Sequence, residues 1–351
     1  MDLTTLLAVL LSYQLGTTQP PIAYQFFQWD AVHPQKIHTL TIDITNPNVT
    51  FQSGLAYGQL FGFETTSQII QHYGGLGGVN GTFFGPYGQP LGFLLQQGQY
   101  LSLPIETTPI FAWDREGDVY VGDLTTHFLM EAGGQEWYIH GFNRSPLPNE
   151  RILFTPEYGA TTRIDRPARN YIFKGDEVID IRITQEPLSI PRDGKVVTEL
   201  LPPPIPQSIF AKGDRPKPIL RKTPDISLWE GFQSGGWIVK GGENVAKPYE
   251  PFMGYTTQRE PRTAIGKTKE GKILLCVVDG RQKGWSGGFN GYELGEFLKD
   301  QNCMDAVYLD GGASSTMVFQ GQVINRPSQQ RRERRVGHAL FFSPHEKYFI
   351  N

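Results

Sequence analysis

The sequence predicts an α+β protein rich in strands, with a mixed sheet and few helices. Glycine (40 residues) and proline (26 residues) are abundant in a chain of 351, which favours short strands and turns over long helices. Most periodic segments alternate apolar and polar residues, as strands do. The best helical stripe, Tyr292–Asp300, leads into the apolar run Ala306–Leu309. The strand Lys272–Val278, this helix and the strand Ala306–Leu309 form a βαβ-like unit. It is the one place where the sequence predicts a pair of parallel strands.

The composition is that of an ordinary globular protein. Hydrophobic residues make up 39%, charged residues 19% and aromatic residues 12% of the chain. The net charge of −3 gives no electrostatic reason to expect nucleic acid as a partner. The two cysteines, Cys276 and Cys303, are too few for a disulfide scaffold, and we expect both to be buried thiols.

The N-terminus resembles a signal segment in one respect only. Leu6–Leu11 is apolar, but Asp2 precedes it and no Lys or Arg does. We treat residues 1–20 as a candidate signal or disordered segment, which favours a secreted, periplasmic or cell-envelope location. The apolar run is too short to span a membrane. Residues 21–351 are predicted to form a single domain.

The elements follow in chain order. Val49–Leu55 is a predicted strand, and Thr66–Tyr73 is a short helix with Thr65 or Thr66 as its N-cap. Ile110–Gly122 reads as a hairpin that turns over residues 116–118. Further strands are predicted at Lys36–Ile44, Trp137–Phe142, Ile152–Thr155, Asn170–Phe173, Val178–Ile183, Arg262–Gly266, Lys272–Val278, Met317–Phe319 and His338–Phe342.

Two segments of the middle are predicted to lie outside regular structure. Arg163, Arg166 and Arg169 cluster between strands, and we expect a solvated loop there. Residues 200–224 contain seven prolines, at positions 202–204, 206, 216, 218 and 224. This segment is predicted to be a stiff connection or exposed loop, and not a helix.

Asn80 stands in a glycine-rich segment, Gly74–Phe84. An Asn side chain can donate and accept hydrogen bonds at once, which suits a sugar hydroxyl or a phosphate oxygen. The alternative is a hairpin turn, because Asn-Gly is a strong turn signal.

Two predicted strands end in a carboxylate followed by glycine. Lys272–Val278 leads into Asp279 and Gly280, and Ala306–Leu309 leads into Asp310 and Gly311. If the strand ends are neighbours, one cleft holds two carboxylates, the minimum for acid–base chemistry at a glycosidic centre. The alternative is that each Asp only caps its turn.

The residues after Asp310 are small and rich in donors. Gly311 and Gly312 let the backbone approach a ligand and could supply N–H donors. Ser314 and Ser315 add hydroxyl groups. Further on, arginines occupy positions 331, 332, 334 and 335 around Glu333. Such a run is usually a solvated face, but one arginine reaching the cleft could bind phosphate through two hydrogen bonds.

These motifs resemble the phosphodiester glycosidase family. The resemblance is carried by Arg262–Gly266, Val278–Arg281, Gly287–Leu298 and Leu309–Ser315, which occur in that family's order and spacing. Val79–Phe84 is similar to the family's N-terminal motif, and the Arg335-Val336 pair is similar to its closing arginine motif.

The resemblance implies hydrolysis of a sugar-1-phosphodiester at the anomeric carbon–oxygen bond, which releases a free sugar and a phosphomonoester. Asp310 would then be the nucleophile or general base, with Asp279 as the second carboxylate. The phosphate would bind to arginines and the sugar to donors near Asp310. The substrate-binding residues expected are Asn80, Arg262, Arg281, Gly311, Gly312, Ser314, Ser315 and Arg335.

Two other functions remain open at this point. One is a non-catalytic carbohydrate-binding protein of the envelope, in which Asp310 and Asn80 hold a sugar. The other is a metal-dependent phosphodiesterase, although the seven histidines are scattered and no His-x-His or HExxH spacing occurs. No cofactor is certain, and carboxylate sites for Mg²⁺ or Ca²⁺ remain open. The expected partner is a sugar-phosphate or glycan substrate. The sequence gives neither the sugar nor the oligomeric state.

Overall fold

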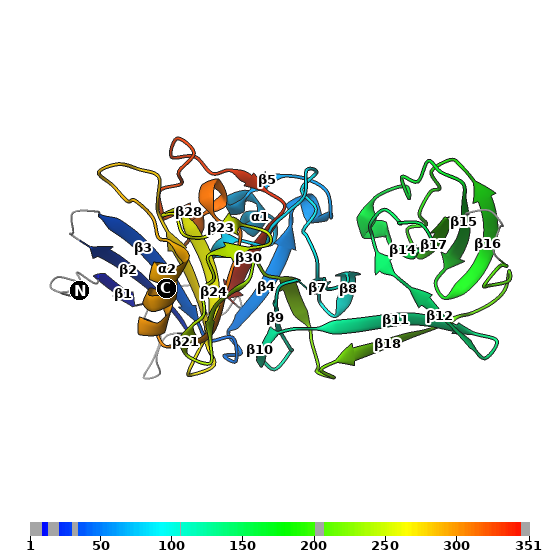
Figure 1. Ribbon diagram of the computed structural model, residues 1–351, viewed down its shortest axis with the longest axis horizontal. Coiled ribbons are helices and arrows are strands. Elements are labelled where there is room, and N and C mark those ends of the chain that lie inside the picture. Colours follow the sequence, from blue (N-terminus) through cyan, green and yellow to red (C-terminus); the bar gives the residue numbers. More distant parts are fainter. Residues whose placement is uncertain (1–8, 13–20, 30–33, 106, 201–206, 345–351) are drawn as a thin grey trace.

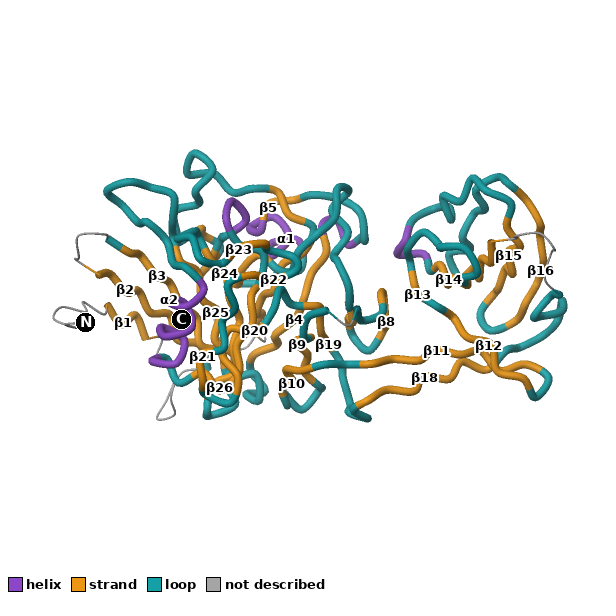
Figure 2. Tube along the Cα trace, viewed as in Figure 1, coloured by secondary structure: helices purple, strands orange, loops and turns teal. Residues whose placement is uncertain are grey.

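The computed structural model describes residues 9–12, 21–29, 34–105, 107–200 and 207–344. Strands dominate it, and helices are few and short (Figure 2). A larger unit contains the described residues before 125 and after 223, and a lobe formed by residues 125–223 extends to one side of it (Figure 1). The β-rich α+β fold predicted from the sequence is therefore confirmed.

The largest sheet has eight strands, in the order β1-β2-β3-β25-β24-β26-β20-β21. Neighbours pair antiparallel throughout, so β25 and β26 run in the same direction with β24 between them. The predicted parallel pair is therefore wrong in one respect, since the two strands are parallel but not adjacent. The strands are β1 Val9–Ser12, β2 Ile22–Trp29, β3 Gln35–Ile42, β25 Ile273–Val278, β24 Arg262–Thr268, β26 Cys303–Tyr308, β20 Trp237–Lys240 and β21 Glu243–Asn244.

A second sheet packs against the first. It contains β28 (Gln322–Val323), β27 (Met317–Phe319), β6 (Gly77–Asn80), β30 (His338–Pro344) and β4 (Val49–Leu55), in that order. The apolar side chains between the sheets form one core, with Leu40, Ile265 and Val307 from the first sheet and Val79 and Leu340 from the second. Asn80 ends a strand, so the hairpin-turn alternative for it is wrong.

Two α-helices cover the outer faces of this pair of sheets in the described residues. The helix α2 (Gly291–Asp300) packs Leu294, Phe297 and Leu298 against the eight-stranded sheet. The helix α1 (Thr66–His72) packs Ile69 and Ile70 against the second sheet. Each begins with a capping box, which satisfies the free backbone N–H groups of the first turn. The predicted N-cap at Thr65 is confirmed.

A third sheet closes one end of the larger unit. Its order is β10-β9-β19-β7-β8, and it includes the predicted hairpin as β9 (Ile110–Trp113) and β10 (Val119–Gly122). Its other strands are β19 (Glu230–Gln233), β7 (Leu94–Gln96) and β8 (Gln99–Ser102). Two short pairs complete the unit: β22 (Tyr249–Glu250) with β23 (Gly254–Tyr255), and β29 (Arg335–Val336) with β5 (Glu64–Thr65). Single 3₁₀ turns are η1 (Ala56–Gly58), η2 (Pro156–Tyr158) and η3 (Gly312–Ser314).

The lobe has its own sheets and its own cores. A ribbon of β12-β11-β18 leads out from the larger unit to a five-stranded sheet, β13-β14-β17-β15-β16 (Figure 1). The buried residues of its two apolar clusters all lie within residues 130–210, and Tyr100, Leu103 and Phe61 of the larger unit pack against them. The strands are β11 Thr125–Ala132, β12 Gln135–Ile139, β13 Gly141–Phe142, β14 Arg151–Phe154, β15 Ala168–Lys174, β16 Glu177–Thr184, β17 Gly194–Leu200 and β18 Lys217–Thr223. The single domain expected over residues 21–351 stays a prediction.

Two expectations for the middle of the chain are wrong in part. The proline-rich segment includes the strand β18, in which Pro218 lies opposite Met130 of β11. Because β18 is an edge strand of its sheet, a proline there costs no internal ladder hydrogen bond. Arg169 lies on β15 and is buried, with an ion pair to Glu199 at 3.3 Å. It is therefore no part of a solvated loop.

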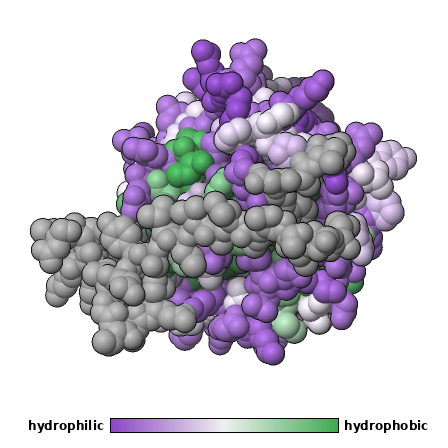
Figure 3. Space-filling view, turned by 90° about the vertical axis from the view of Figure 1, so that its left-hand side faces the viewer, coloured by the Kyte–Doolittle hydropathy of each residue, from purple (hydrophilic) through white to green (hydrophobic). Residues whose placement is uncertain are grey.

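Most of the signal-like N-terminal segment lies outside the described residues. Within the described part, no helix is long and apolar enough to cross a membrane. Hydrophilic residues prevail where described residues are visible on the face beside β1 and β2 (Figure 3). Cys276 and Cys303 are both free and buried, as predicted.

Candidate active site

Both carboxylates predicted from the sequence lie at one end of the eight-stranded sheet. Asp279 follows the last residue of β25, and Asp310 lies two residues beyond β26. The strand β24 runs between them in the opposite direction, so its first residues, Arg262 and Thr263, lie at this same end. Strands two apart in a sheet are separated by roughly 10 Å. The sheet thus places the two aspartates on one rim, with β24 between them.

Asp310 is the most perturbed acid at this rim. Burial raises the pKa of its carboxyl group to about 6, although the Ser314 hydroxyl, the Arg334 charge and the Gly311 N–H all favour the ionised form. Its own N–H donates to the Gly81 carbonyl at 3.1 Å, which holds the residue against the second sheet. A carboxyl group with a pKa near neutrality can exchange protons during turnover.

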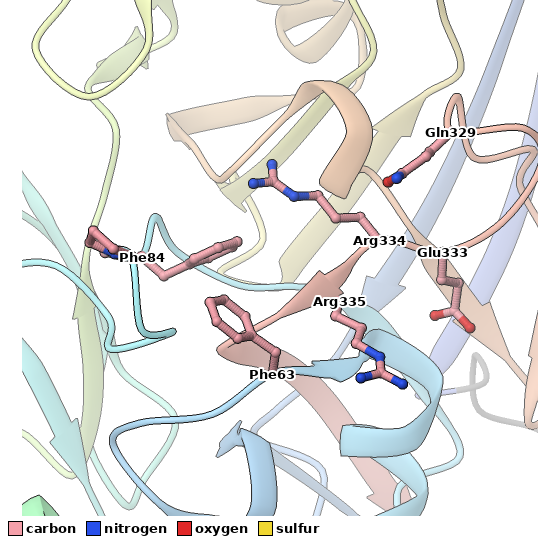
Figure 4. A pocket seen from close by; sticks show the side chains of 8 residues that line it. Phe63, Phe84, Gln329, Glu333, Arg334 and Arg335 are labelled. Atoms are coloured by element: carbon pink, nitrogen blue, oxygen red, sulfur yellow. The ribbon is translucent and has the colours of Figure 1, made fainter.

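Arg334 connects Asp310 to an open cavity. Its Nη1 atom donates to the Ser314 hydroxyl at 3.3 Å, and its guanidinium lies 5.2 Å from the centroid of the Phe84 ring. Arg335 is the next residue, and its side chain points away from Arg334 (Figure 4). Successive residues of an extended chain face opposite sides, so the two arginines cannot serve the same point.

The cavity beside Arg334 has a volume of about 680 Å³. Phe63 and Phe84 form its aromatic wall, with their rings at 73° to each other, and Gly85 and Pro86 continue that wall. The opposite side consists of Gln329, Glu333, Arg334 and Arg335 (Figure 4). This is room for a substituent of the size of a sugar or larger.

Asn80 is buried and its amide is engaged by the protein. Its Nδ2 atom donates to the Asp310 carbonyl at 2.6 Å, and its Oδ1 atom accepts from the Thr263 hydroxyl and the Thr316 N–H. The Thr263 hydroxyl also meets the Ser315 hydroxyl at 3.0 Å. These contacts favour positioning of the Asp310 loop by Asn80 and Ser315 over direct contact with substrate.

Asp279 is likewise surrounded by protein donors. The Trp285 indole N–H donates to Oδ2 at 2.8 Å, while the Asn325 amide and the Arg326 N–H donate to Oδ1. Burial raises the pKa of Asp279 in spite of these donors. The Asn325 amide also donates to the Ser315 carbonyl at 3.1 Å. Asp279 therefore ties together the loops that surround Asp310.

The two arginines predicted beside the motifs differ in placement. Arg262 is buried and donates to the carbonyls of Phe289 at 3.0 Å and Gln258 at 2.9 Å, so it braces backbone. Arg281 is more open and pairs with Glu260, and a Cβ on Gly312 would lie 3.3 Å from its Nη2 atom. The backbone of Arg281 has a φ of 58°, which is uncommon for a residue other than glycine. Arg281 is therefore the better placed of the two to meet a phosphate near Asp310.

The glycine N–H groups of the loop already have acceptors. The Gly312 N–H donates to the Pro261 carbonyl at 2.8 Å. The Gly311 N–H donates to the Asp310 carboxylate, which lowers the pKa of Asp310. Gly312 has a φ of 60°, where a residue with a side chain would be strained. The glycines thus shape the loop around Asp310.

Sequence reasoning missed two groups at this end of the sheet. Arg334 was passed over for Arg335, because the sequence does not show which of two adjacent arginines faces the site. Glu250 on β22 was not considered at all. It is 3% exposed, its Oε1 atom has no partner among the described residues, and its carboxyl group lies against Gly236. Gly236 accepts a hydrogen bond from the Tyr308 N–H, so Glu250 lies beside the end of β26.

No group of three or more His, Cys, Asp or Glu side chains with the geometry of a metal site occurs in the described part of the chain. The expectation for Mg²⁺ or Ca²⁺ stays a prediction.

The chain is similar to known proteins in part of its sequence and in most of its fold. A family model for phosphodiester glycosidase matches residues 169–343. The N-acetylglucosamine-1-phosphodiester alpha-N-acetylglucosaminidases of mouse and human are 36% and 40% identical to the chain over 103 and 118 residues. These alignments cover 26% and 30% of the chain but only 20% and 22% of the relatives. The chain thus aligns with about a fifth of their length.

Three solved structures share the fold. A hypothetical protein from Synechocystis has a TM-score of 0.79 at 22% identity, over 93% of this chain and 62% of its own. A putative exported protein from Burkholderia pseudomallei has a TM-score of 0.70 at 21% identity, over 90% and 75%. The catalytic domain of zebrafish N-acetylglucosamine-1-phosphodiester alpha-N-acetylglucosaminidase, auto-inhibited by its pro-peptide, has a TM-score of 0.54 at 17% identity, over 97% and 88%. With the family model matched across the strands that carry Arg262, Asp279 and Asp310, the chain belongs to the phosphodiester glycosidase family.

Proposed function

We propose that the protein hydrolyses a sugar-1-phosphodiester at the anomeric carbon–oxygen bond and releases a free sugar and a phosphomonoester. The observation that supports this most is the chain of contacts from Asp310 through Ser314 to Arg334. These contacts place the Asp310 carboxyl group, whose pKa is raised, near the Arg334 guanidinium, which lines the cavity. A glycosidic centre needs a carboxylate and the phosphate needs a cation, and both are present here.

The bond changes follow from these roles. The bond between the anomeric carbon and the phosphate oxygen breaks, and its electron pair leaves with the phosphomonoester. A water molecule supplies the new oxygen at the anomeric carbon, either directly, with Asp310 accepting its proton, or after Asp310 has bonded to that carbon. The phosphomonoester is a good leaving group, so the barrier depends mainly on stabilising positive charge at the sugar.

The other residues support this centre in distinct ways. Arg334 and Arg281 hold the departing phosphate, because their guanidinium groups lie beside Ser314 and Gly312. Asn80, Thr263 and Ser315 fix the loop that carries Asp310. Glu250 is a second buried carboxylate beside the end of β26, and its Oε1 atom has no protein partner among the described residues.

Hydrolysis in oxygen-18 water tests the reaction. A panel of sugar-1-phosphodiesters is incubated with the protein, and both products are examined by mass spectrometry. We expect the label at the anomeric hydroxyl of the sugar. Label in the phosphate product would show attack at phosphorus, and the protein would then be a phosphodiesterase. Binding of the sugars without turnover would make it a carbohydrate-binding protein.

We also propose that the protein acts outside the cytoplasm. The signal-like N-terminus suggests export, and one structural relative is named as a putative exported protein. Fractionation of cells that produce the full chain, with sequencing of the mature N-terminus, tests this. Recovery of uncleaved protein in the cytoplasm alone would contradict it.

A further inference from the structure

The segment Arg326–Arg335 is the most basic part of the described surface near the site, and we call it the arginine loop. It contains five arginines and one acid, Glu333, whereas the whole chain has a net charge of −3. In Figure 1 it lies at the top of the larger unit, between β28 and β5. Of the five arginines in this loop, only Arg334 has a role in the proposed reaction, so the other four charges need another explanation.

The arginine loop is held in a defined shape. At its start, the Arg326 N–H donates to Asp279, and the Arg326 guanidinium lies 4.8 Å from the centroid of the Trp285 ring. At its end, Arg335 pairs with Thr65 between β29 and β5. Its tip is a tight turn in which residues 330 and 331 have φ values of 56° and 62°. The charges are thus presented at fixed places.

The positive charge of the arginine loop is not balanced within the described residues. Glu333, its only acid, accepts hydrogen bonds from the Ser67 N–H at 2.9 Å and the Ser67 hydroxyl at 2.5 Å. Its carboxylate is therefore directed at the start of α1. None of the ion pairs among the described residues involves Arg331, Arg332 or Arg335.

The arginine loop also borders the substrate cavity. Gln329, Glu333, Arg334 and Arg335 form one side of the space of about 680 Å³ that opens from Arg334 (Figure 4). A substrate whose scissile phosphate lies at Arg334 would direct its leaving group into this cavity. The leaving group would then pass Arg335; Arg331 and Arg332 lie in the chain between two lining residues, Gln329 and Glu333.

We propose that the natural substrate is a polyanionic glycan, whose leaving-group side carries further phosphodiester or carboxylate groups that bind the arginine loop. This inference rests on the proposed function and adds the class of its substrate. Fixed cations without protein partners attract a chain of anions over about 8–10 Å at moderate salt, which raises the local concentration of such a substrate.

The experiment compares two substrates of the same sugar. One is methyl N-acetylglucosamine 1-phosphate, with a single phosphodiester, and the other is a hexamer of N-acetylglucosamine 1-phosphate units. We expect kcat/KM for the hexamer to exceed that for the methyl ester at least tenfold at low salt. The double variant Arg331→Gln/Arg332→Gln should lose that preference and hydrolyse the methyl ester as the wild type does. Lys212→Gln/Lys217→Gln, which removes two exposed charges from the lobe, is the matched control and should keep the preference.

Each further outcome decides the matter. Equal kcat/KM for both substrates, or a preference that survives in the arginine variant, would overturn the inference while leaving the proposed function intact. If the protein hydrolyses neither these two substrates nor any sugar-1-phosphodiester of the panel, the proposed function fails, and binding of the hexamer by calorimetry tests the arginine loop alone. A single-stranded DNA of equal charge is the specificity probe. Binding of DNA as tight as that of the hexamer would reduce the loop to a general polyanion surface and overturn the inference.

Discussion

In the proposed function, Asp310 combines burial with a role that requires charge. Its pKa of about 6 in the fold, against 3.8 for an exposed Asp, means that ionisation opposes folding. Its protonated form stabilises the fold fully below pH 4, and this contribution is lost as pH rises through about 6. A difference of two units corresponds to roughly 3 kcal/mol. Carboxyl groups whose burial costs stability in this way are concentrated at functional sites.

We therefore expect Asp310→Asn to abolish turnover without weakening the fold. The amide keeps the size of the side chain and removes its charge, so kcat should fall at least a thousandfold, or about 4 kcal/mol of barrier. At pH 8 the melting temperature should equal or exceed that of the wild type, and the gain should shrink towards pH 4. Retention of more than about a tenth of the activity, or 1.4 kcal/mol of barrier, would remove Asp310 from the mechanism.

The pH profile gives an independent check on the same carboxyl group. As nucleophile or base, Asp310 must be ionised, so log kcat/KM should rise with pH up to about 6 and then level off. Initial rates between pH 4.5 and 8.5, with stability monitored at each pH, measure this. A rate that falls as pH rises through 6 would show that the protonated form is the active one.

Arg334 and Arg335 form a matched pair of neighbours. Because only Arg334 reaches Ser314, Arg334→Gln should lower kcat/KM about a hundredfold, in the range seen for loss of a charge-stabilising donor. Arg335→Gln should lower it less than fivefold for a substrate with a single phosphodiester. A larger loss at Arg335 than at Arg334 would reverse the assignment made from the structure.

The sequence indicated Asp310 as a candidate more readily than the residues that surround it. A strand that ends in Asp-Gly-Gly identifies Asp310, because the signal is local. Asn80 was predicted as a ligand, yet its partners at Thr263, Thr316 and Asp310 are 183 to 236 residues away in the chain. No local pattern reveals such contacts, so the positioning role that we infer for Asn80 depends on the fold, and its role as a ligand stays a prediction.

At the scale of the element, the Asn80 amide at the end of β6 joins the loop after β26 to Thr263 of β24 and to Thr316 before β27. Removal of the Asn80 side chain deprives three groups of a hydrogen bond: the Asp310 carbonyl, the Thr263 hydroxyl and the Thr316 N–H. We expect Asn80→Ala to cost about 2–4 kcal/mol in the free energy of unfolding, measured with urea. Gln322→Ala, on the exposed edge strand β28, is the control and should cost less than 0.5 kcal/mol. Equal stability of the two variants would show that the amide contributes nothing.

The order of the strands was the part of the fold that the sequence could not give. The segments of β24, β25, α2 and β26 were all predicted within a few residues. Their arrangement was not, since an apolar run does not record which neighbour it pairs with. The insertion of β24 between β25 and β26 is decided by tertiary packing, and it brings Thr263 between the two aspartates.

At the scale of the whole molecule, the lobe is separable in principle. The buried clusters of the larger unit contain no residue between 125 and 223. We expect replacement of residues 125–223 by a short Gly-Ser linker to give a protein that unfolds cooperatively and hydrolyses a methyl sugar-1-phosphodiester within tenfold of the wild-type rate. Phe61, which packs edge-to-face on Tyr158 of the lobe, would become exposed and lower the melting temperature somewhat. A chain that fails to fold would support the single domain predicted from the sequence.

The sequence did not reveal the lobe because its strands resemble those of the larger unit in length and composition. Both units alternate short apolar segments with glycine turns, so no shift in composition marks a boundary. The proline-rich segment of residues 200–224 was the one visible break; it ends where the lobe ends, and no comparable signal marks the start of the lobe near Thr125.

The pairing of the two strands that connect the lobe to the larger unit has a consequence for evolution. Thr125 and Thr223 lie opposite each other on β11 and β18, so the chain leaves and re-enters the larger unit at a single point. An inserted segment whose two ends meet can be lengthened, shortened or exchanged for another without any change in the strands that hold Asp310. Exchange of this segment between relatives should therefore yield proteins that keep the proposed reaction.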